Sequence, residues 1–135
     1  IDDGLPDGAD KDLPAAVRRC VSIADPEHVP AGQYAKQVLV ARGWWDKLKG
    51  RIVPAADVRA ALMMIIRGEC DAGLVYATDL RAAKGVRQLG TTSEHDPIVY
   101  PVAAVKGRMT PAVKTFLDYM ASGPAQATAR TRGFQ

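Results

Sequence analysis

Apolar residues along the first two thirds of the chain fall in short runs that alternate with helix-like patterns. Consecutive apolar residues indicate buried strands, whereas apolar residues spaced three and four apart indicate one face of a helix. The predicted elements are strands at 20–24, 51–53, 72–76 and 86–89, and helices at 31–42, 56–67 and 78–85. This alternation with tight connections predicts an α/β fold, a mainly parallel sheet with helices on both faces.

The pattern changes after a polar loop at 90–96. An apolar run at 98–105 contains Pro101, which favours an edge or crossover strand over a central strand. The Thr110–Pro111 step predicts the start of a helix, and Gly123–Pro124 separates that helix from a last one. The two C-terminal helices are therefore predicted to form a separate packing unit.

Composition narrows the class of protein. The chain has 135 residues, of which 47% are apolar and 24% charged, so it is long enough to bury a core and is typical of a globular protein. The formal net charge of +3 is spread along the chain, which argues only weakly for a polyanionic partner such as nucleic acid. No apolar run is long enough to span a bilayer, and the acidic N-terminus does not resemble a secretory signal. The protein is accordingly expected to be cytoplasmic or to have lost its signal.

Two strand-to-helix turns share a proline at the start of the helix. In DPEHVPAGQYAKQ, residues 25–37, Pro30 suits the first helical turn and is followed by small residues, and 53–58 repeats this arrangement. The first amides of a helix have no intrahelical acceptor and lie at the positive end of its dipole, so they favour an anion. Tyr76 ends the third predicted strand, where its hydroxyl could donate to the same anion. Prolines and tyrosines at such positions also occur for packing alone, so the pattern leaves anion binding open.

Four segments carry a resemblance to a known family. They are DPEHVPAGQYAKQ, PAADVRAALMMIIRGECDAGLVYATD, DPIVYPVAAVKG and FLDYMASGPAQATARTRGF, in this order. Together they closely resemble the periplasmic molybdate-binding proteins (ModA), the substrate-binding components of molybdate ABC transporters, over about residues 19–134. The resemblance implies a lobe of the type II periplasmic binding protein fold. It also implies that a tetrahedral oxyanion, molybdate or tungstate, is bound between two lobes and delivered to a membrane ABC permease.

The resemblance also implies where the ligand is held. Matched motif by motif, the contacts from this lobe are the backbone amides of Ala31 in VPAGQY and Val58 in ADVRAA and the hydroxyl of Tyr76 in GLVYATD. The resemblance places the protein in the periplasm. We accordingly expect no enzyme activity, no cofactor, no coordinated metal cation, no nucleic-acid partner and no direct insertion into a membrane.

The family has a further lobe that precedes the matched region, so we expect this chain to hold half of a binding site. The expected organisation has three parts. Residues 1–18 lead in from a missing first lobe, and residues 19–100 form the second α/β lobe. Residues 101–135 contain the crossover strand and the C-terminal helices, which belong structurally to the first lobe.

Two other classes of protein remain as alternatives. An oxyanion-sensing domain of a transcription regulator would need a helix-turn-helix segment upstream, and none is visible. An enzyme would need a catalytic constellation; Glu27 and His28 lack a matched nucleophile and are expected to be turn residues satisfied by backbone groups. Glu94, His95 and Asp96 are expected to form a solvated loop, because consecutive residues seldom converge on one metal ion.

The two cysteines are too few for a disulfide scaffold and lack metal-ligand spacing. In a lobe of this family type, the strands that begin near Cys20 and Ala72 are expected to be parallel neighbours, which places Cys20 and Cys70 at the sheet edge opposite the ligand. Neighbouring strands lie ~4.8 Å apart, within the Cα separation of ~4.4–6.8 Å that a disulfide requires. Side chains on opposite faces could not form the bond, so a disulfide and two small buried thiols both remain open.

Overall fold

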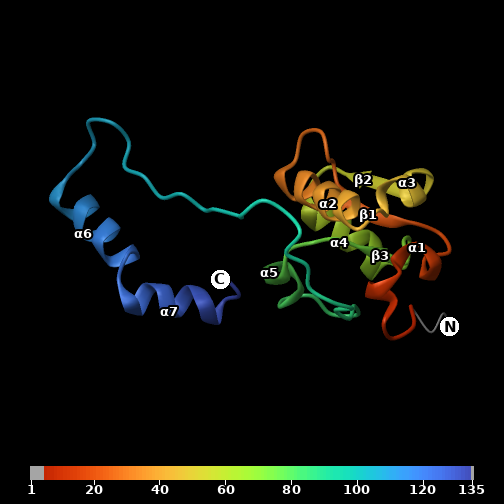
Figure 1. The fold of residues 1–135 in the computed structure, drawn as a ribbon. Helices are drawn as coiled ribbons and strands as arrows, with labels where there is room; N and C mark the ends of the chain where they lie inside the picture. Colours follow the sequence, from red (N-terminus) through yellow and green to blue (C-terminus); the bar gives the residue numbers. More distant parts are fainter. Residues whose placement is uncertain (1–4, 135) are drawn as a thin grey trace. The chain divides into compact units, whose positions relative to one another are not determined.

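The structure is a computed structural model that describes residues 5–134. The chain divides into two compact units, Ile1–Asp96 and Pro97–Gln135, and each is considered by itself (Figure 1). The first unit contains, in chain order, η1 (Ala9–Lys11), α1 (Leu13–Ala16), β1 (Val21–Ala24), α2 (Pro30–Ala41), α3 (Trp45–Leu48), η2 (Lys49–Arg51), β2 (Ile52–Ala55), α4 (Val58–Ile66), β3 (Ala72–Gly73) and α5 (Ala77–Leu80). The second unit contains α6 (Pro111–Met120) and α7 (Gly123–Thr131).

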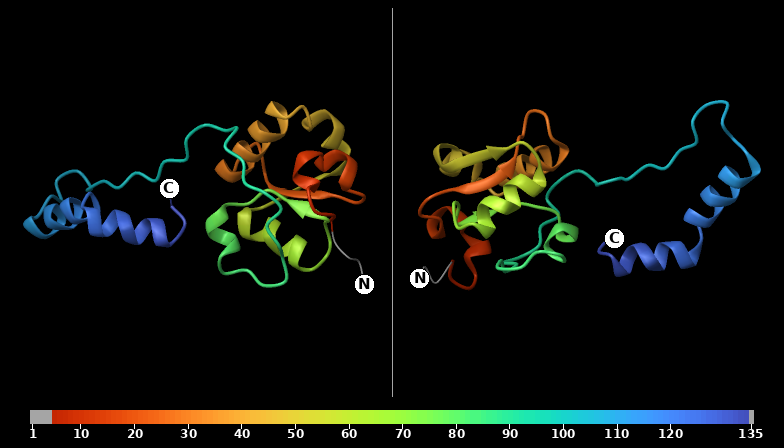
Figure 2. Two further views of the ribbon diagram at one scale, coloured as in Figure 1. Left: turned by 60° about the horizontal axis from the view of Figure 1, so that its bottom comes forward. Right: turned by 180° about the vertical axis from the view of Figure 1, so that it is seen from behind.

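The sheet of the first unit has three parallel strands in the order β2-β1-β3. Val21 of β1 lies opposite Ile52 of β2 on one side and Ala72 of β3 on the other. Helices α2 and α3 lie on one face of the sheet and α4 lies on the other, as the left view of Figure 2 shows. The predicted α/β fold, with a parallel sheet and helices on both faces, is therefore confirmed.

The central strand β1 is buried along its whole length and serves both faces of the sheet. Because successive strand side chains point to opposite faces, Val21 and Ile23 pack with Leu39 of α2 and Leu48 of α3. On the other face, the Ser22 hydroxyl lies 3.3 Å from the Met64 sulfur of α4. The sequence of β1 thus explains why helices cover both faces.

The N-terminal segment adds a third group of apolar side chains to the α2 side of this core. The contributing residues are Leu5, Ala9, Leu13 and Val17. Their spacing of four residues places them on one side of the segment, and each is at most 9% exposed. Residues 5–17 are thus part of the core of the first unit, and the origin of residues 1–18 in a first lobe stays a prediction.

Helix α2 begins in direct contact with the end of β1. A Cβ atom placed on Gly32 would lie 2.2 Å from the carbonyl oxygen of Ala24 and 2.5 Å from that of Asp25. No side chain fits at such separations, so only glycine lets the first turn of α2 approach the strand this closely. The close contact fixes the position of the helix start relative to the sheet.

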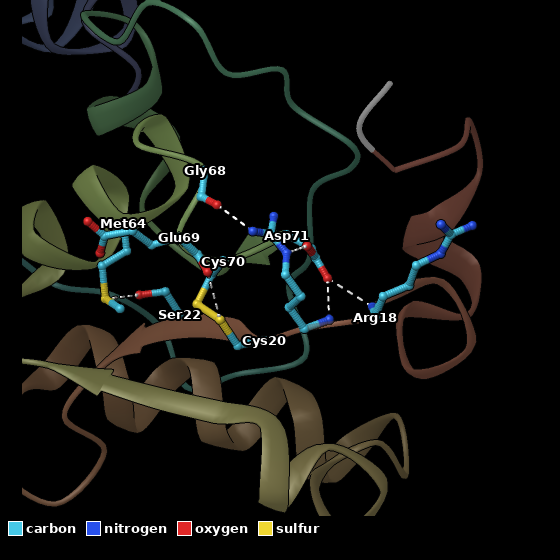
Figure 3. The surroundings of a disulfide bond; sticks show 9 residues. Arg18, Cys20, Ser22, Met64, Gly68, Glu69, Cys70 and Asp71 are labelled. Atoms are coloured by element: carbon cyan, nitrogen blue, oxygen red, sulfur yellow. Dashed lines mark hydrogen bonds and ion pairs between the residues drawn. A yellow bond between two sulfur atoms is a disulfide. The ribbon is translucent and has the colours of Figure 1, made fainter. Parts of the chain in front are cut away.

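The opposite, amino-terminal edge of the sheet is cross-linked. Cys20 and Cys70 form a disulfide with a Cα–Cα distance of 4.8 Å, which confirms the first of the two outcomes left open by the sequence (Figure 3). Cys20 lies on the same face of β1 as Ser22, and Cys70 follows α4 after Gly68, whose φ of 67° ends that helix. The bond therefore joins the start of β1 to the loop between α4 and β3.

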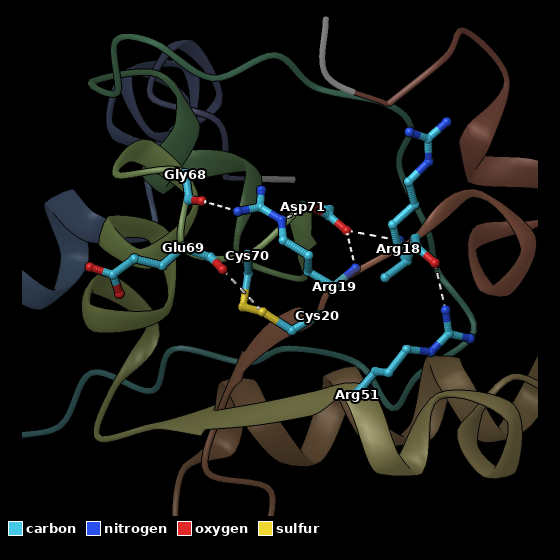
Figure 4. Close-up of polar contacts among 9 residues, drawn as sticks. Arg18, Arg19, Cys20, Arg51, Gly68, Glu69, Cys70 and Asp71 are labelled. Carbon is cyan, nitrogen blue, oxygen red and sulfur yellow. Dashed lines mark hydrogen bonds and ion pairs between the residues drawn. A yellow bond between two sulfur atoms is a disulfide. The ribbon is translucent and has the colours of Figure 1, made fainter. Parts of the chain in front are cut away.

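Polar contacts surround this disulfide (Figure 4). One oxygen of the Asp71 carboxylate accepts hydrogen bonds from the backbone amides of Arg18 and Arg19 at 2.8 and 2.6 Å. The guanidinium of Arg51 donates to the carbonyl oxygens of Val17 and Pro14 at 2.5 and 3.1 Å. Each of the three strands is directly preceded by a residue that makes one of these contacts: Cys20, Arg51 and Asp71. The start of every strand is therefore bonded to another part of the first unit.

Two predicted strands are wrong. Residues 86–89 and 98–105 form no strand in the described part of the chain. Apolar runs report burial, but a strand also needs a neighbouring strand with free hydrogen-bonding groups. The segment around Arg87 is attached instead through the Arg87 guanidinium, which donates to the Leu5 carbonyl oxygen and pairs with the Asp7 carboxylate at 2.8 Å.

Two further elements are shorter than the pattern predicts. Strand β3 ends at Gly73, although an apolar run continues to residue 76, and α5 ends at Leu80.

In the second unit, the Thr110 hydroxyl accepts from the amide of Val113 at 3.3 Å and caps α6 as predicted. Phe116 of α6 is 55% exposed. Among the described residues, no helix combines the length and apolar character needed to cross a membrane.

Candidate functional site

The three residues singled out by the sequence lie at one edge of the sheet. Because β1, β2 and β3 are parallel, their carboxyl ends share that edge, and each strand leads into a helix. Ala31 is the second residue of α2, Val58 is the first residue of α4, and Tyr76 directly precedes α5. The structure therefore brings these positions to the place where open α/β sheets bind ligands.

The start of α2 presents uncapped backbone amides. Its N-cap is Val29, whose side chain has no polar atom, and the helix carries a proline in its first turn. The amide of Gln33 is the first to donate back to Val29, at 3.0 Å, so the amide of Ala31 precedes the intrahelical ladder. Ala31 is only 7% exposed. A small buried residue at the positive end of a helix dipole suits an anion that binds the main chain.

The start of α4 is capped differently. The side chain of Asp57 accepts a hydrogen bond from the amide of Ala60 at 2.8 Å. This cap satisfies the third amide of the helix, whereas the amide of Val58, the first of the helix, has no intrahelical acceptor. The exposed Asp57 carboxylate also adds negative charge at this end of α4. An anion bound here would have to be oriented by the backbone rather than by an attractive side-chain charge.

Tyr76 is half-buried and lies three residues beyond β3. Its backbone is extended, with φ −70° and ψ 145°, and its carbonyl oxygen accepts from the amide of Asp79 at 3.0 Å. The residue therefore sets the entry of the chain into α5. Tyr76 does not end the third strand, as the sequence predicted, because β3 stops at Gly73, but it still lies between that strand and the next helix.

The turn between β1 and α2 is organised by Asp25, to which sequence reasoning gave no role. One carboxylate oxygen of Asp25 accepts from the amide of Glu27 at 2.9 Å, and the other lies 2.8 Å from Nδ1 of His28. The hydrogen bond from the Glu27 amide, together with that to His28, lowers the pKa of Asp25. The hydrogen bond to Asp25 raises the pKa of His28. The expectation that backbone groups satisfy His28 is wrong, because its partner is a carboxylate.

Residues 94–96, which we call the strap, lie along the outer side of α2. Arg42 Nε donates to a Glu94 carboxylate oxygen at 3.0 Å, and the Tyr34 and His95 rings are 5.5 Å apart. Gln37 exchanges two hydrogen bonds with Asp96, at 2.7 and 2.9 Å. These contacts hold the strap on α2, while Glu94 and Asp96 remain exposed, as expected of a solvated loop. No group of side chains suited to a metal ion occurs among residues 5–134.

Comparison with known proteins identifies the family. The family described as bacterial extracellular solute-binding protein matches residues 4–135. The chain belongs to this family. Among its relatives are the molybdate-binding protein ModA of Escherichia coli, 43% identical over 84% of this chain and 45% of the relative, and ModA of Haemophilus influenzae, 40% identical over 84% and 46%. The chain spans about half the length of the curated relatives it matches.

Solved structures show the same fold. The substrate-binding domain of a putative molybdenum ABC transporter from Clostridium difficile superposes with a TM-score of 0.82 at 32% identity, covering 95% of this chain and 57% of that one. The periplasmic molybdate-binding protein of Azotobacter vinelandii gives a TM-score of 0.66 at 27% identity, covering 87% and 54%. The lobe is therefore an α/β lobe of a periplasmic binding protein.

Proposed function

We propose that the protein containing this chain binds a tetrahedral oxyanion, molybdate or tungstate, between two lobes and delivers it to an ABC importer. The observation that carries this proposal is the meeting of three strand ends at one sheet edge, where α2 and α4 each begin with a backbone amide that has no intrahelical acceptor. Relatives named as molybdate-binding proteins support the choice of ligand.

In this proposal the chain contributes three neutral donors. The amides of Ala31 and Val58 donate to oxygens of the anion from the starts of α2 and α4, and the hydroxyl of Tyr76 donates from the end of the third strand segment. Fixed dipoles of this kind stabilise a buried anion without a counter-charge. Selection then depends on the size of the site, and molybdate and tungstate, both tetrahedral dianions of similar size, would compete for it.

The remaining parts of the proposal follow from the family. The site is completed by a first lobe in the part of the relatives that this chain does not span, and residues 101–135 return to that lobe. The exposed Phe116 and Tyr119 on α6 are consistent with a helix that packs on another part of the protein. The protein works in the periplasm, where it docks on a membrane permease, and it has no enzymatic activity, no cofactor and no nucleic-acid partner.

Isothermal titration tests this function. The full-length parent and the 135-residue chain are each titrated with molybdate, tungstate, sulfate and phosphate. We expect the parent to bind molybdate and tungstate with similar affinity and the two smaller anions much more weakly, because the site selects by size. Equal affinity for sulfate and molybdate would contradict the proposal. Weaker binding by the chain alone than by the parent is the result expected of a half-site.

A further inference from the structure

Asp25 links the sheet to the first turn of α2 through four contacts. Its amide donates to the carbonyl oxygen of Ala55 at the end of β2 at 2.8 Å, and its own carbonyl oxygen accepts from the amide of Val29 at 2.9 Å. Its two carboxylate oxygens hold Glu27 and His28, as described above. Its carbonyl oxygen is also one of the atoms that exclude a side chain from position 32. Asp25 therefore determines where the uncapped start of α2 lies.

This arrangement places Asp25 in the turn that leads into the proposed anion site. Asp25 is six residues before Ala31, and its backbone lies against the first turn of α2. A fixed negative charge there opposes the binding of a dianion. Asp25 and His28 act on each other, and the carboxylate of Glu27 also acts on His28. Glu27 is itself paired with Lys36 of α2 at 2.9 Å, so His28 is the group that offsets Asp25.

We propose that Asp25 positions the start of α2 and that protonated His28 neutralises its carboxylate, so that oxyanion affinity falls when His28 loses its proton. This inference rests on the oxyanion site proposed above and assigns to that site a positioning residue and a charge-compensating residue. The geometry carries it: the Asp25–His28 contact of 2.8 Å closes the same turn that presents the Ala31 amide.

The sign of the pH dependence follows from the pair. The contact with Asp25 raises the pKa of His28 above its ordinary value of 6.5, so His28 remains protonated to a higher pH than a free histidine. Below that pKa the pair is neutral, and above it the Asp25 charge is uncompensated. His28 is 81% exposed, so solvent weakens the pair and allows the proton to exchange freely.

The first test needs no ligand. The 135-residue chain is followed by nuclear magnetic resonance while the pH is varied between about 5.5 and 9, which brackets the ordinary pKa of histidine. The imidazole resonances of His28 and the amide resonance of Ala31 are expected to change at the same pH in the wild type. Asp25→Asn, which keeps the side-chain shape but removes the charge, should move both transitions to lower pH. His28→Gln should abolish the transition at Ala31.

The chain offers a matched control. His95→Gln removes the other histidine, whose Nδ1 contacts the backbone carbonyl of Asp96 at 2.7 Å rather than a carboxylate. This variant should leave the transition at Ala31 unchanged. A transition at Ala31 that follows His95, or that is identical in Asp25→Asn and the wild type, would overturn the role of the pair.

The second test measures affinity for sodium molybdate in the full-length parent. From about pH 6 to about pH 8.5, binding should weaken by about threefold to tenfold, because one uncompensated negative charge near solvent repels a dianion. His28→Gln should bind as weakly at the lower pH as the wild type does at the higher pH, and Asp25→Asn should shift the midpoint to lower pH.

The two tests separate the possible failures. If the wild-type parent binds no molybdate at either pH while the Ala31 resonance still titrates with His28, the proposed oxyanion site is wrong and only the positioning role of Asp25 survives. If the parent binds molybdate with an affinity that is independent of pH, the charge compensation is wrong and the oxyanion site survives.

Discussion

Asp71 holds Arg19 by both its main chain and its side chain. The carboxylate accepts from the Arg19 amide at 2.6 Å and from Nε of its guanidinium at 2.8 Å, and the same guanidinium donates to the Gly68 carbonyl oxygen at 2.6 Å. The Asp71 side chain is 9% exposed. This contact joins the segment before β1 to the segment before β3 beside the disulfide, so it is a second link between the same two parts of the chain.

We expect Asp71→Asn to lower the free energy of unfolding by about 1–3 kcal/mol, because hydrogen bonds to a charged acceptor are replaced by weaker ones. Burial raises the pKa of Asp71, but the hydrogen bonds from Arg19 and Arg18 outweigh it and leave that pKa below its ordinary value of 3.8. Because the pKa of Asp71 is lower in the folded than in the unfolded state, the stabilisation is complete at pH values above the unfolded-state pKa. It is lost as the pH falls through the folded-state pKa. Denaturant unfolding should therefore show a smaller difference between wild type and variant in acid than at neutral pH. A constant difference at all pH values would contradict this explanation.

The disulfide should be detectable as the absence of free thiols in denatured, non-reduced protein. It closes a loop with a sequence separation of 50 residues, so the double variant Cys20→Ser/Cys70→Ser should lose about 2–5 kcal/mol of stability. Because Asp71 joins the same segments, we expect the double variant to keep its fold. Two reactive thiols per chain would show that the bond is absent, and a non-reducing gel excludes a bond between chains.

Gly32→Ala should destabilise the protein by about 1–3 kcal/mol, since the added methyl group forces backbone atoms of β1 and α2 apart. The matched control is Gly50→Ala, where an added Cβ would meet no atom within 4 Å. That variant should be neutral or stabilised by up to about 1 kcal/mol. Thermal or denaturant unfolding compares the two, and similar effects in both variants would refute the close contact.

Val58→Pro tests a backbone donor directly. Proline is well suited to the first position of a helix, and the preceding Asp57 has the extended backbone that proline requires of its neighbour, with φ −156° and ψ 177°. The variant should fold normally but bind molybdate more weakly by about 1–3 kcal/mol, because one hydrogen bond to a charged ligand is lost. Val58→Ala, which keeps the amide proton, controls for loss of the side chain. If both variants bind alike, the amide of Val58 is not a ligand.

Tyr76→Phe should weaken molybdate binding by about 1–3 kcal/mol in the full-length parent, the usual cost of removing one hydrogen bond to a charged group. Tyr119→Phe is the control, since Tyr119 lies on α6 and is 54% exposed. Isothermal titration measures both. Unchanged affinity in Tyr76→Phe would remove the hydroxyl from the proposed site.

Much of the first unit could be predicted because its signals are local. The buried run before Asp25 and the apolar face of the following helix specify β1 and α2, and a parallel sheet then brings Ala31 and Val58 to one edge. The positions of these residues therefore agree with the sequence interpretation. Their role as ligands of an anion stays a prediction.

The sequence could not reveal contacts that depend on distant or folded-back partners. Arg87 binds residues 5–7 and Gln37 binds Asp96, 59 residues away, and neither pair has a pattern in the sequence. The partner of His28 is only three residues away, but the turn must form before Asp25 faces it. An Asp followed by a turn could have suggested this, because its side chain often accepts from the amide two residues on.

The contact at Gly32 means that the sheet determines the dimensions of the proposed site. Since the first turn of α2 rests on the end of β1, the helix cannot slide along the strand without moving the sheet itself. Hydrogen bonds keep neighbouring strands ~4.8 Å apart. Because α4 follows β2, the neighbour of β1, the spacing of the strands also sets the separation between the start of α4 and the start of α2. The size of an anion accepted at this edge is then a property of the main chain, and exchanging individual side chains should leave it nearly unchanged.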